Sequence, residues 1–282
     1  MANSITEARV QQYKANITML YQQKMSKLRK IGRVEYVVGK QAFFERLAPS
    51  EALEKTVRHS EQSIVDSIHS RRMVILRDYY WNDYIDKEDK LKMLIDPQSP
   101  YAQNAASALG RKLDSLVYLG ARGTALSGET GSTSVVLPAG QKIAHGSAGM
   151  SLAKILQGSR LLNAAEVPMD GRYAVIESNG LEDLLNIQQL TSSDYNAVKL
   201  LTTGEMNQFM GFEWTIYNFA AESSVYYGIF CHRDALGIAL AQDVMTRIDE
   251  LPNKHYLTQV YASTSGGATR VLDEGVVEVA YQ

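Results

Sequence analysis

Apolar side chains recur at every third or fourth position in several stretches of the chain, which is the spacing of one helix face. Residues 99–122 are the strongest case, because Ser99 and Pro100 form a favourable helix start and Gly120 or Gly123 can end it. The shared apolar face is Ala102, Ala105, Leu109, Leu113, Leu116 and Val117. The pattern predicts a long helix that acts as the spine of the body.

The same spacing predicts three other helices. Residues 5–30 lack Gly and Pro, and their one apolar stripe is Val10, Tyr13, Ile17, Leu20, Tyr21, Met25 and Leu28. Because the rest of this helix is polar, we expect it to lie on another surface rather than to be stable alone. Residues 151–166 predict an amphipathic helix that Pro168 ends, and residues 181–187 predict a short helix.

Apolar runs of strand length lie between and after these helices. The shorter runs are at residues 34–38, 73–76, 134–137 and 172–178. Residues 204–282 are apolar and closely spaced to their last residue, so we expect the chain to end inside its own core. Within this last third, two strand-like runs flank one helix-like run at residues 223–249, and residues 270–282 predict a final strand.

Residues 34–90 combine many charges with strand character and supply few residues for a deep core. We interpret them as a long two-stranded excursion that leaves the body and returns. An isolated hairpin is marginal in water, so this one needs a surface to lie on. Its aromatic cluster, Tyr79, Tyr80, Trp81 and Tyr84, favours intersubunit anchors over a stacking surface for bases.

Charge is distributed unevenly along the chain. Seven basic residues and one acidic residue give residues 1–33 a charge of +6, which leaves −8 for the remainder of a chain whose formal net charge is −2. Such a basic arm meets nucleic acid, an acidic partner or a neighbouring copy, or else it is a solvated helix face. The candidate contacts are Lys14, Lys24, Lys27, Arg29, Lys30 and Arg33.

Several kinds of chemistry lack a sequence signal. Cys231 is the single cysteine, so no intrachain disulfide forms and folding in a reducing cytoplasm is expected. The glycine-rich residues 123–149 lack the Gly-Lys-Ser/Thr of a phosphate loop and predict a mobile surface loop. Cys231 and His232 are adjacent and point apart, and His145 has no partner at metal spacing. We predict no catalytic residue, metal or cofactor, and no apolar run reaches the roughly 18 residues of a membrane span.

The order of these parts resembles the major capsid proteins of tailed bacteriophages, which share the HK97-like fold. RYAVIESNGLEDLLN (172–186) is similar to the strand and helix of that family's axial domain. GEMNQFMGFEWTIYN (204–218), YYGIFCHRDALGIALAQDV (226–244) and RVLDEGVVEVAYQ (270–282) are similar to its later segments. The resemblance covers nearly the whole chain as a pattern of elements, although none of the short motifs is specific alone.

The resemblance implies an α+β fold with an N-terminal arm, an extended β-hairpin loop, a peripheral domain with a long spine helix, and an axial domain. On this chain the expected parts are the arm at 1–33, the extended loop at 34–90, the peripheral domain at 91–150 and again at 246–282, and the axial domain at 151–245.

The implied function is self-assembly into an icosahedral head shell around double-stranded DNA. The expected partners are many copies of the chain in hexamers and pentamers, scaffolding, portal and decoration proteins, and DNA bound without sequence specificity; no membrane is expected. The protein is then part of the virion and is assembled in the host cytoplasm. Alternatives are an encapsulin-like nanocompartment shell, a cytosolic nucleic-acid-binding module that uses the basic arm and the aromatic cluster, and an enzyme without a linear signature.

Overall fold

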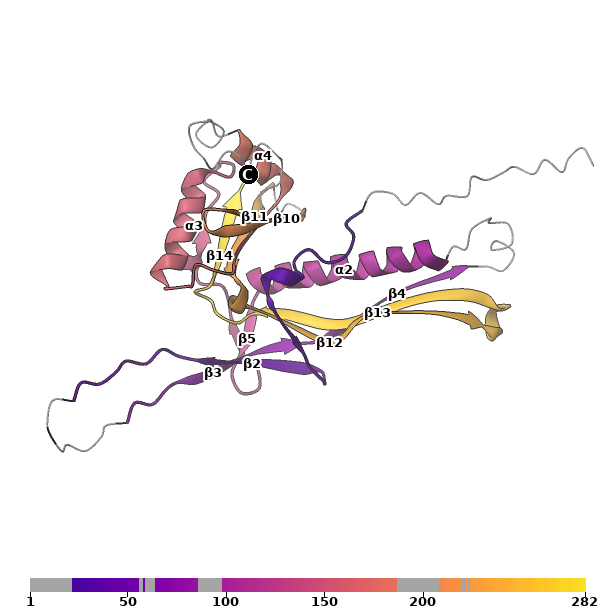
Figure 1. Ribbon diagram of the computed structural model, residues 1–282, viewed down its shortest axis with the longest axis horizontal. Coiled ribbons are helices and arrows are strands. Elements are labelled where there is room, and N and C mark those ends of the chain that lie inside the picture. The colour runs from indigo at the N-terminus through magenta and orange to yellow at the C-terminus, as the bar shows by residue number, and fades with distance from the viewer. Residues whose placement is uncertain are drawn as a thin grey trace, which may run out of the picture.

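The computed structural model describes residues 22–55, 58, 64–85, 98–186, 208–219, 222 and 224–282. These residues form an α+β fold in which three helices accompany three β-sheets (Figure 1). The helices are α2 (Gln98–Arg122), α3 (Leu152–Ala164) and α4 (Ser178–Leu185). The predicted spine helix is therefore confirmed as α2, and the two shorter predicted helices of the body are confirmed as α3 and α4.

A long four-stranded sheet lies along α2, in the order β1-β12-β13-β4. Its strands are β1 (Arg33–Tyr36), β12 (Leu236–Leu251), β13 (Leu257–Arg270) and β4 (Arg77–Ile85). Because β1 pairs only with residues 237–240 of β12, the edge of β12 beyond them is open within the described residues. The register between β12 and β13 is irregular between Leu240 and Met245, which is where the long sheet is bulged.

A six-stranded mixed sheet forms the second body, in the order β7-β14-β11-β8-β10-β9. Its strands are β7 (Lys142–Ile143), β14 (Val276–Tyr281), β11 (Tyr226–His232), β8 (Arg172–Ile176), β10 (Phe212–Ile216) and β9 (Gln208–Phe209). Residues of α3 and α4, such as Ile155 and Leu184, pack on one face, and Val117 of α2 packs on the other. All six residues of β14 are consequently buried, so the last strand of the chain lies in the core, as predicted.

The projecting hairpin consists of β2 (Gln41–Leu47) and β3 (His69–Ile75), which pair antiparallel over their whole length. Two short strands, β5 (Ala125–Ser127) and β6 (Thr133–Val135), extend this pair into a third sheet. Figure 1 shows the hairpin reaching away from both bodies, at the end of α2 opposite to Gln98. The extended β-hairpin of the sequence prediction is thus confirmed, although β1 and β4 on either side of it belong to the long sheet.

The helix predicted within 223–249 is wrong. Residues 233–235 form one 3-10 turn, in which the His232 side chain accepts the N–H of Asp234, and β12 then runs as a strand. Leu236–Leu240 lie between β1 and β13, so hydrogen bonds on both sides override a helical periodicity. The last segment, 246–282, divides between two sheets, since β13 lies in the long sheet and β14 in the six-stranded one. The domain boundaries stay predictions.

The predicted helix over residues 5–30 is also wrong where the structure describes it. Residues 22–28 are irregular, and a 3-10 turn at Arg29–Ile31 follows. Met25 has a left-handed backbone with a φ of 59°, which a helix does not tolerate. Residues 5–21 lie outside the described residues.

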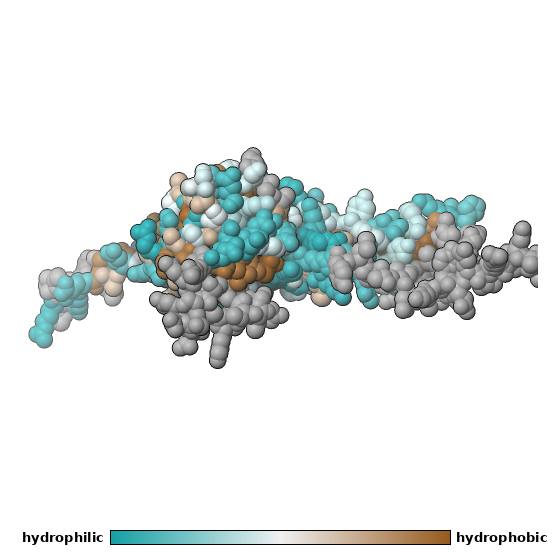
Figure 2. Space-filling model, turned by 90° about the horizontal axis from the view of Figure 1, so that it is seen from above, coloured by the Kyte–Doolittle hydropathy of each residue, from teal (hydrophilic) through white to brown (hydrophobic). Residues whose placement is uncertain are grey.

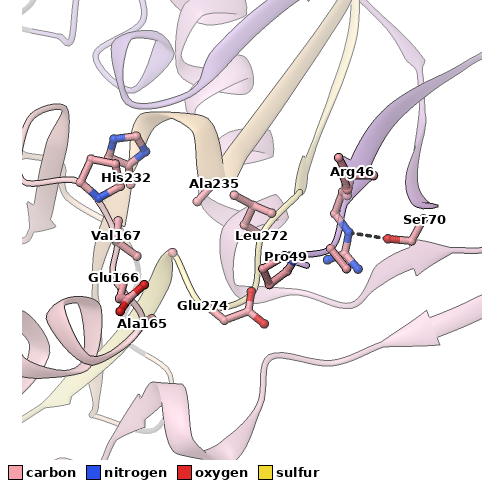
Figure 3. A pocket seen from close by; sticks show the side chains of 14 residues that line it. Arg46, Pro49, Ser70, Ala165, Glu166, Val167, His232, Ala235, Leu272 and Glu274 are labelled. Carbon is pink, nitrogen blue, oxygen red and sulfur yellow. Dashed lines mark hydrogen bonds between the residues drawn. The ribbon is translucent and has the colours of Figure 1, made fainter. Parts of the chain in front are cut away.

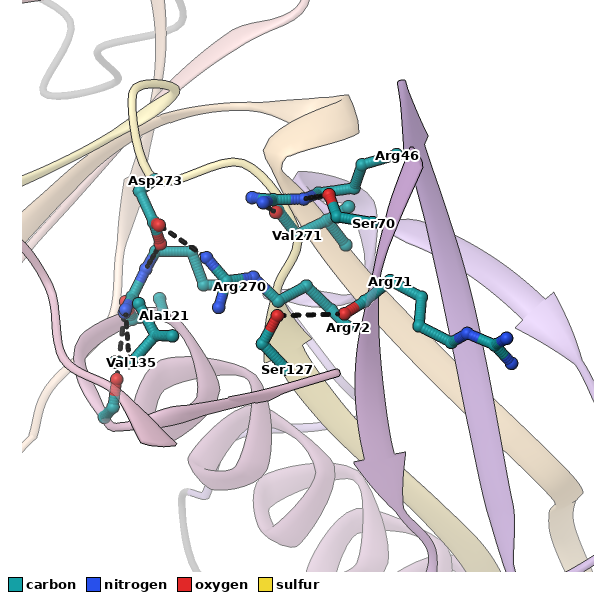
Figure 4. A network of polar contacts seen from close by, with 11 residues as sticks. Arg46, Ser70, Arg71, Arg72, Ala121, Ser127, Val135, Arg270, Val271 and Asp273 are labelled. Atoms are coloured by element: carbon teal, nitrogen blue, oxygen red, sulfur yellow. Dashed lines mark hydrogen bonds and ion pairs between the residues drawn. The ribbon is translucent and has the colours of Figure 1, made fainter. Parts of the chain in front are cut away.

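One buried turn joins the three parts of the structure (Figure 4). Arg270, which is fully buried at the end of β13, donates to Asp273 at 2.6 Å and to the carbonyl oxygens of Ala121, Gly123 and Val135 at 2.9–3.1 Å. Arg72 of the hairpin, 2% exposed, reaches the other oxygen of Asp273 at 2.5 Å. Burial lowers the pKa of Arg72, and the Asp273 carboxylate opposes that shift. The end of α2, the hairpin and the β13–β14 turn are therefore held by a single carboxylate and two arginines.

We expect Arg270→Ala to destabilise the unassembled subunit by about 3 kcal/mol, because it leaves one oxygen of Asp273 and three carbonyl oxygens without their buried donor. Chemical denaturation followed by circular dichroism measures this loss. Arg77→Ala, at an exposed position of β4, is the matched control and should change stability by less than about 0.5 kcal/mol. Equal losses for the two variants would contradict the structural role of the buried turn.

Candidate functional site

The arm, as far as it is described, is clasped to the middle of α2 by a buried carboxylate. Asp114 is fully buried, and its oxygens accept the backbone N–H groups of Lys27 and Leu28, each at 2.9 Å. They also accept short hydrogen bonds from the side chains of Gln23 and Ser26. A buried carboxylate is costly unless it is hydrogen-bonded. The four donors therefore fix both the carboxylate and the path of the arm.

Gly110, one helical turn before Asp114, allows the arm to pass close to α2. A Cβ atom at Gly110 would lie 2.7 Å from the carbonyl carbon of Met25 and 2.9 Å from the backbone nitrogen of Ser26. Any larger residue would displace the arm. The sequence analysis did not predict this contact between the arm and α2. The signal for it in the sequence is Asp114, a charged residue directly after Leu113 on the apolar side of the predicted helix.

Arg29 attaches the arm to the long sheet. Its guanidinium makes two hydrogen bonds to the Asp243 carboxylate, at 2.8 and 3.2 Å, and one to the Tyr36 hydroxyl at 2.8 Å. Partial burial disfavours the charged form of Asp243, but the hydrogen bond from Arg29 and other favourable contacts outweigh it, so the pKa of Asp243 is lowered. Asp243 lies in the bulged part of β12, so this ion pair holds the arm where the sheet is irregular.

Two lysines attach the arm to the six-stranded sheet. Lys30 forms an ion pair with Glu213, and Lys27 Nζ donates to the carbonyl oxygen of Ile216 at 3.2 Å. Both acceptors lie on β10. The arm thus crosses from one body to the other and contacts both.

The remaining basic candidates differ in their surroundings. Arg33 pairs with Glu35 on its own strand at 2.6 Å, Lys24 is exposed, and Lys14 lies outside the described residues. The structure therefore places Arg29, Lys30 and Arg33 in ion pairs within the subunit. Contacts of the six basic residues with DNA or with another copy stay a prediction.

The aromatic cluster of β4 divides between the two faces of the long sheet. Tyr79 and Trp81 pack beneath α2, against Ala105, Leu109 and Ala262. Tyr80 is 73% exposed and Tyr84 43% exposed, and Tyr80 stacks on Tyr261 with ring centroids 6.3 Å apart. Strand alternation explains the division, because neighbouring side chains point to opposite faces. Tyr79 and Trp81 hold the sheet to α2, and contacts of Tyr80 and Tyr84 with another subunit stay a prediction.

The hairpin carries apolar side chains that nothing in the described chain covers. The exposed ones are Leu47, Leu53, Ile64, Val65 and Ile68, of which Ile64 is 88% exposed. Figure 2 shows the molecule from above as a thick body with a thin extension on either side, and most of the described surface is hydrophilic. Apolar residues gathered on one narrow projection are a mark of an interaction site.

Two side chains of types that often serve in catalysis, a thiol and an imidazole, are buried within the body. Burial raises the pKa of the Cys231 thiol to about 12, so this cysteine is not a thiolate near neutral pH. His232 bonds the carbonyl oxygen of Asp170 at 2.9 Å and accepts the N–H of Asp234. In the part of the chain that the structure describes, no group of three or more His, Cys, Asp and Glu side chains is placed to hold a metal ion. Likewise, none of the described helices is both long and apolar enough to cross a bilayer.

A spine helix on a long sheet, a second body, a projecting hairpin and a clasped arm define a subunit built to contact further subunits. The model of the phage capsid protein family matches residues 5–282, and the chain belongs to that family. Its role is structural, in the head shell of a phage, which implies self-assembly into capsomers and a place in the virion. A comparison of the sequence with curated proteins found no match.

Solved structures show the same fold at low sequence identity. The capsid of the cyanophage P-SCSP1u matches with a TM-score of 0.76 at 15% identity, covering 100% of this chain and 95% of that one. Chains of a native GTA particle capsid and of Mycobacterium phage Che8 match with TM-scores of 0.71 and 0.70, each at 16% identity. The GTA match covers 99% of this chain and 97% of the other, and the Che8 match covers 95% of each. The HK97-like fold expected from the sequence is confirmed.

Asp114→Asn should release the arm from α2, because the neutral amide loses charge-assisted bonds worth roughly 2 kcal/mol. We expect the amides of Lys27 and Leu28 to exchange about 30-fold faster in hydrogen-exchange measurements on the subunit. Asp66→Asn, at an exposed position of the hairpin, is the control and should leave these amides unchanged. Unchanged exchange in Asp114→Asn would show that the clasp does not depend on the charge.

Trp81→Ala and Tyr80→Ala should differ in their effect on the stability of the subunit, because the two side chains lie on opposite faces of the long sheet. Trp81→Ala opens a gap beneath α2 and should lower the stability of the subunit by about 2 kcal/mol, less than for a fully buried Trp. Tyr80→Ala should change it by less than about 0.5 kcal/mol, because the ring is mostly exposed. Denaturation of both variants tests this, and a larger loss for Tyr80→Ala would contradict the assignment of the two faces.

Proposed function

We propose that copies of this chain form a closed icosahedral shell of hexamers and pentamers, in which the hairpin of one copy lies on the body of the next. The exposed apolar residues of the hairpin carry this proposal, because they project where no described part of their own subunit covers them. The face of the long sheet that the described residues leave exposed at Tyr80 and Tyr84 supplies a second association surface of a composition typical of interfaces.

The shell is proposed to enclose double-stranded DNA and to be assembled in the host cytoplasm. Contact with DNA would be through phosphates and independent of sequence. The ion pairs of Arg29, Lys30 and Arg33 reduce the positive charge that the arm has left for this contact. Scaffolding, portal and decoration proteins are the further proposed partners, and the role proposed for the chain is structural and not enzymatic.

A nanocompartment that holds a protein cargo shares this architecture, and the contents of purified particles separate the two functions. Nuclease-resistant DNA inside the particles supports the phage shell, and a protein cargo without DNA overturns it. A nucleic-acid-binding module would instead remain a monomer or dimer with salt-dependent affinity.

The hairpin contact is tested by Ile64→Asp with Ile68→Asp in one chain. Two carboxylates at these exposed positions should leave the subunit folded but stop assembly, since each would be buried unpaired in the interface. Light scattering and negative-stain microscopy on chains expressed with a scaffolding protein measure assembly, and melting temperature checks the fold. Ile64→Val with Ile68→Val is the matched control and should assemble normally. Uniform closed shells from the Asp variant would contradict the role of the hairpin.

A further inference from the structure

A cleft of about 450 Å³ lies where the base of the hairpin, the end of α3 and the β13–β14 turn meet (Figure 3). Most of its lining is apolar, with Leu47 and Pro49 from the hairpin, Val167 after α3, and Leu272 from the turn. Leu47 is 62% exposed and Leu272 39% exposed, so the apolar wall is open to an occupant. None of the interactions described above fills this space.

The polar groups of the cleft favour a cation. The exposed carboxylates of Glu166 and Glu274 line it, and neither takes part in an ion pair within the described residues. Arg46, the arginine of the lining, is held by Ser70 Oγ at 3.1 Å and by the carbonyl oxygen of Val271 at 3.0 Å, as Figures 3 and 4 show. Because the two carboxylates outnumber this one guanidinium, the lining carries a net negative charge beside an apolar wall.

The N-terminal arm has the complementary pattern. In residues 9–20 the basic residues are Arg9 and Lys14, with no acidic residue, and the apolar residues are Val10, Tyr13, Ile17, Met19 and Leu20. The clasped part of the arm leads away from its own cleft. Leu28 is bonded to Asp114, and Gln22, six residues earlier, is bonded to Asn104, nearer the start of α2. The cleft adjoins the Arg270 turn at the other end of α2.

We propose that this cleft receives residues 9–20 of a second copy, with Lys14 between the carboxylates of Glu166 and Glu274 and the apolar side chains against Leu47 and Leu272. The inference rests on the proposed assembly function. The 21 residues that precede Gln22 can span about 70 Å when extended, which is enough to reach a neighbouring subunit. The arm of each subunit then locks the hairpin base of the next.

The local backbone at Glu166 permits a variant that removes the carboxylate without harming the fold. Glu166 follows α3 with a φ of 53°, its N–H bonds the carbonyl oxygen of Asn163, and the N–H of Val167 bonds that of Leu162. This is the helix-terminating arrangement in which glycine is most favourable. Glu166→Gly should therefore keep or raise the melting temperature of the subunit.

The test is zero-length carbodiimide coupling of carboxylates to lysines in assembled shells, followed by mass spectrometry of the linked peptides. Shells are assembled from an equimolar mixture of ¹⁵N-labelled and unlabelled chains. Lys14 is the single lysine before Lys24, so a link from it is unambiguous. We expect Lys14 linked to Glu166 or Glu274, with mixed-isotope pairs about as frequent as same-isotope pairs.

The double variant Glu166→Gly, Glu274→Gln should lose these links and dissociate at lower salt than the parent shell. Ser147→Gly is the matched control, because it relieves a φ of 53° outside the cleft and should keep both the links and the salt resistance. Shells that form normally without a Lys14 link to either glutamate overturn this inference and leave the assembly function standing. Links found solely in same-isotope pairs overturn the second copy as the source of the arm, and failure to form shells at all overturns the assembly function together with it.

Discussion

The structure depends on the buried ion pairs around Asp273. Burying one carboxylate between two arginines costs several kcal/mol of desolvation, which is repaid when hydrogen bonds satisfy the charges. Every side-chain nitrogen of Arg270 has a partner, because it bonds Asp273 and three carbonyl oxygens, two of them at the end of α2. Arg72 differs, since its Nε and Nη1 atoms are buried without a partner. The buried turn is therefore well hydrogen-bonded where it meets α2. Where it meets the hairpin, two nitrogens of Arg72 lack a hydrogen-bond partner among the described residues.

The body and the base of the hairpin have separate hydrophobic cores of different size. The six-stranded sheet and α2 share a continuous core, in which Val117, Ile229 and Val276 are almost fully buried. The hairpin meets the body through a smaller core of its own, in which Phe44 and Val74 pack with Ala239 and Val271. The Arg72 ion pair and a short pairing of β3 with β5 add polar contacts to this core. In the proposed shell of hexamers and pentamers, neighbouring subunits meet at different angles, and the smaller core at the base of the hairpin is where that difference would be accommodated.

The sequence predicted those parts whose periodicity agrees with their final contacts. The α2 pattern held because its apolar face, including Leu109 and Val117, packs against both bodies. The β12 prediction failed because apolar residues such as Leu236 and Leu240 suit a buried strand as well as a helix, and the choice is made by β1 and β13 from distant parts of the chain. Asp114 as the clasp could not be assigned, since its four donors lie 86 to 91 residues away in sequence.

Charge patterning identified the arm but not how its charge is used. Counting residues 1–33 gives a strongly basic segment, which suggests an anionic polymer as its partner. The structure shows that Arg29, Lys30 and Arg33 are paired with acidic residues of the same chain, two of them, Asp243 and Glu213, on different sheets. Part of the positive charge of the arm is thus neutralised by acidic residues of its own subunit. A long-range electrostatic excess can therefore serve to order a segment on its own subunit, which a count of charges along the sequence does not distinguish from binding to a separate partner.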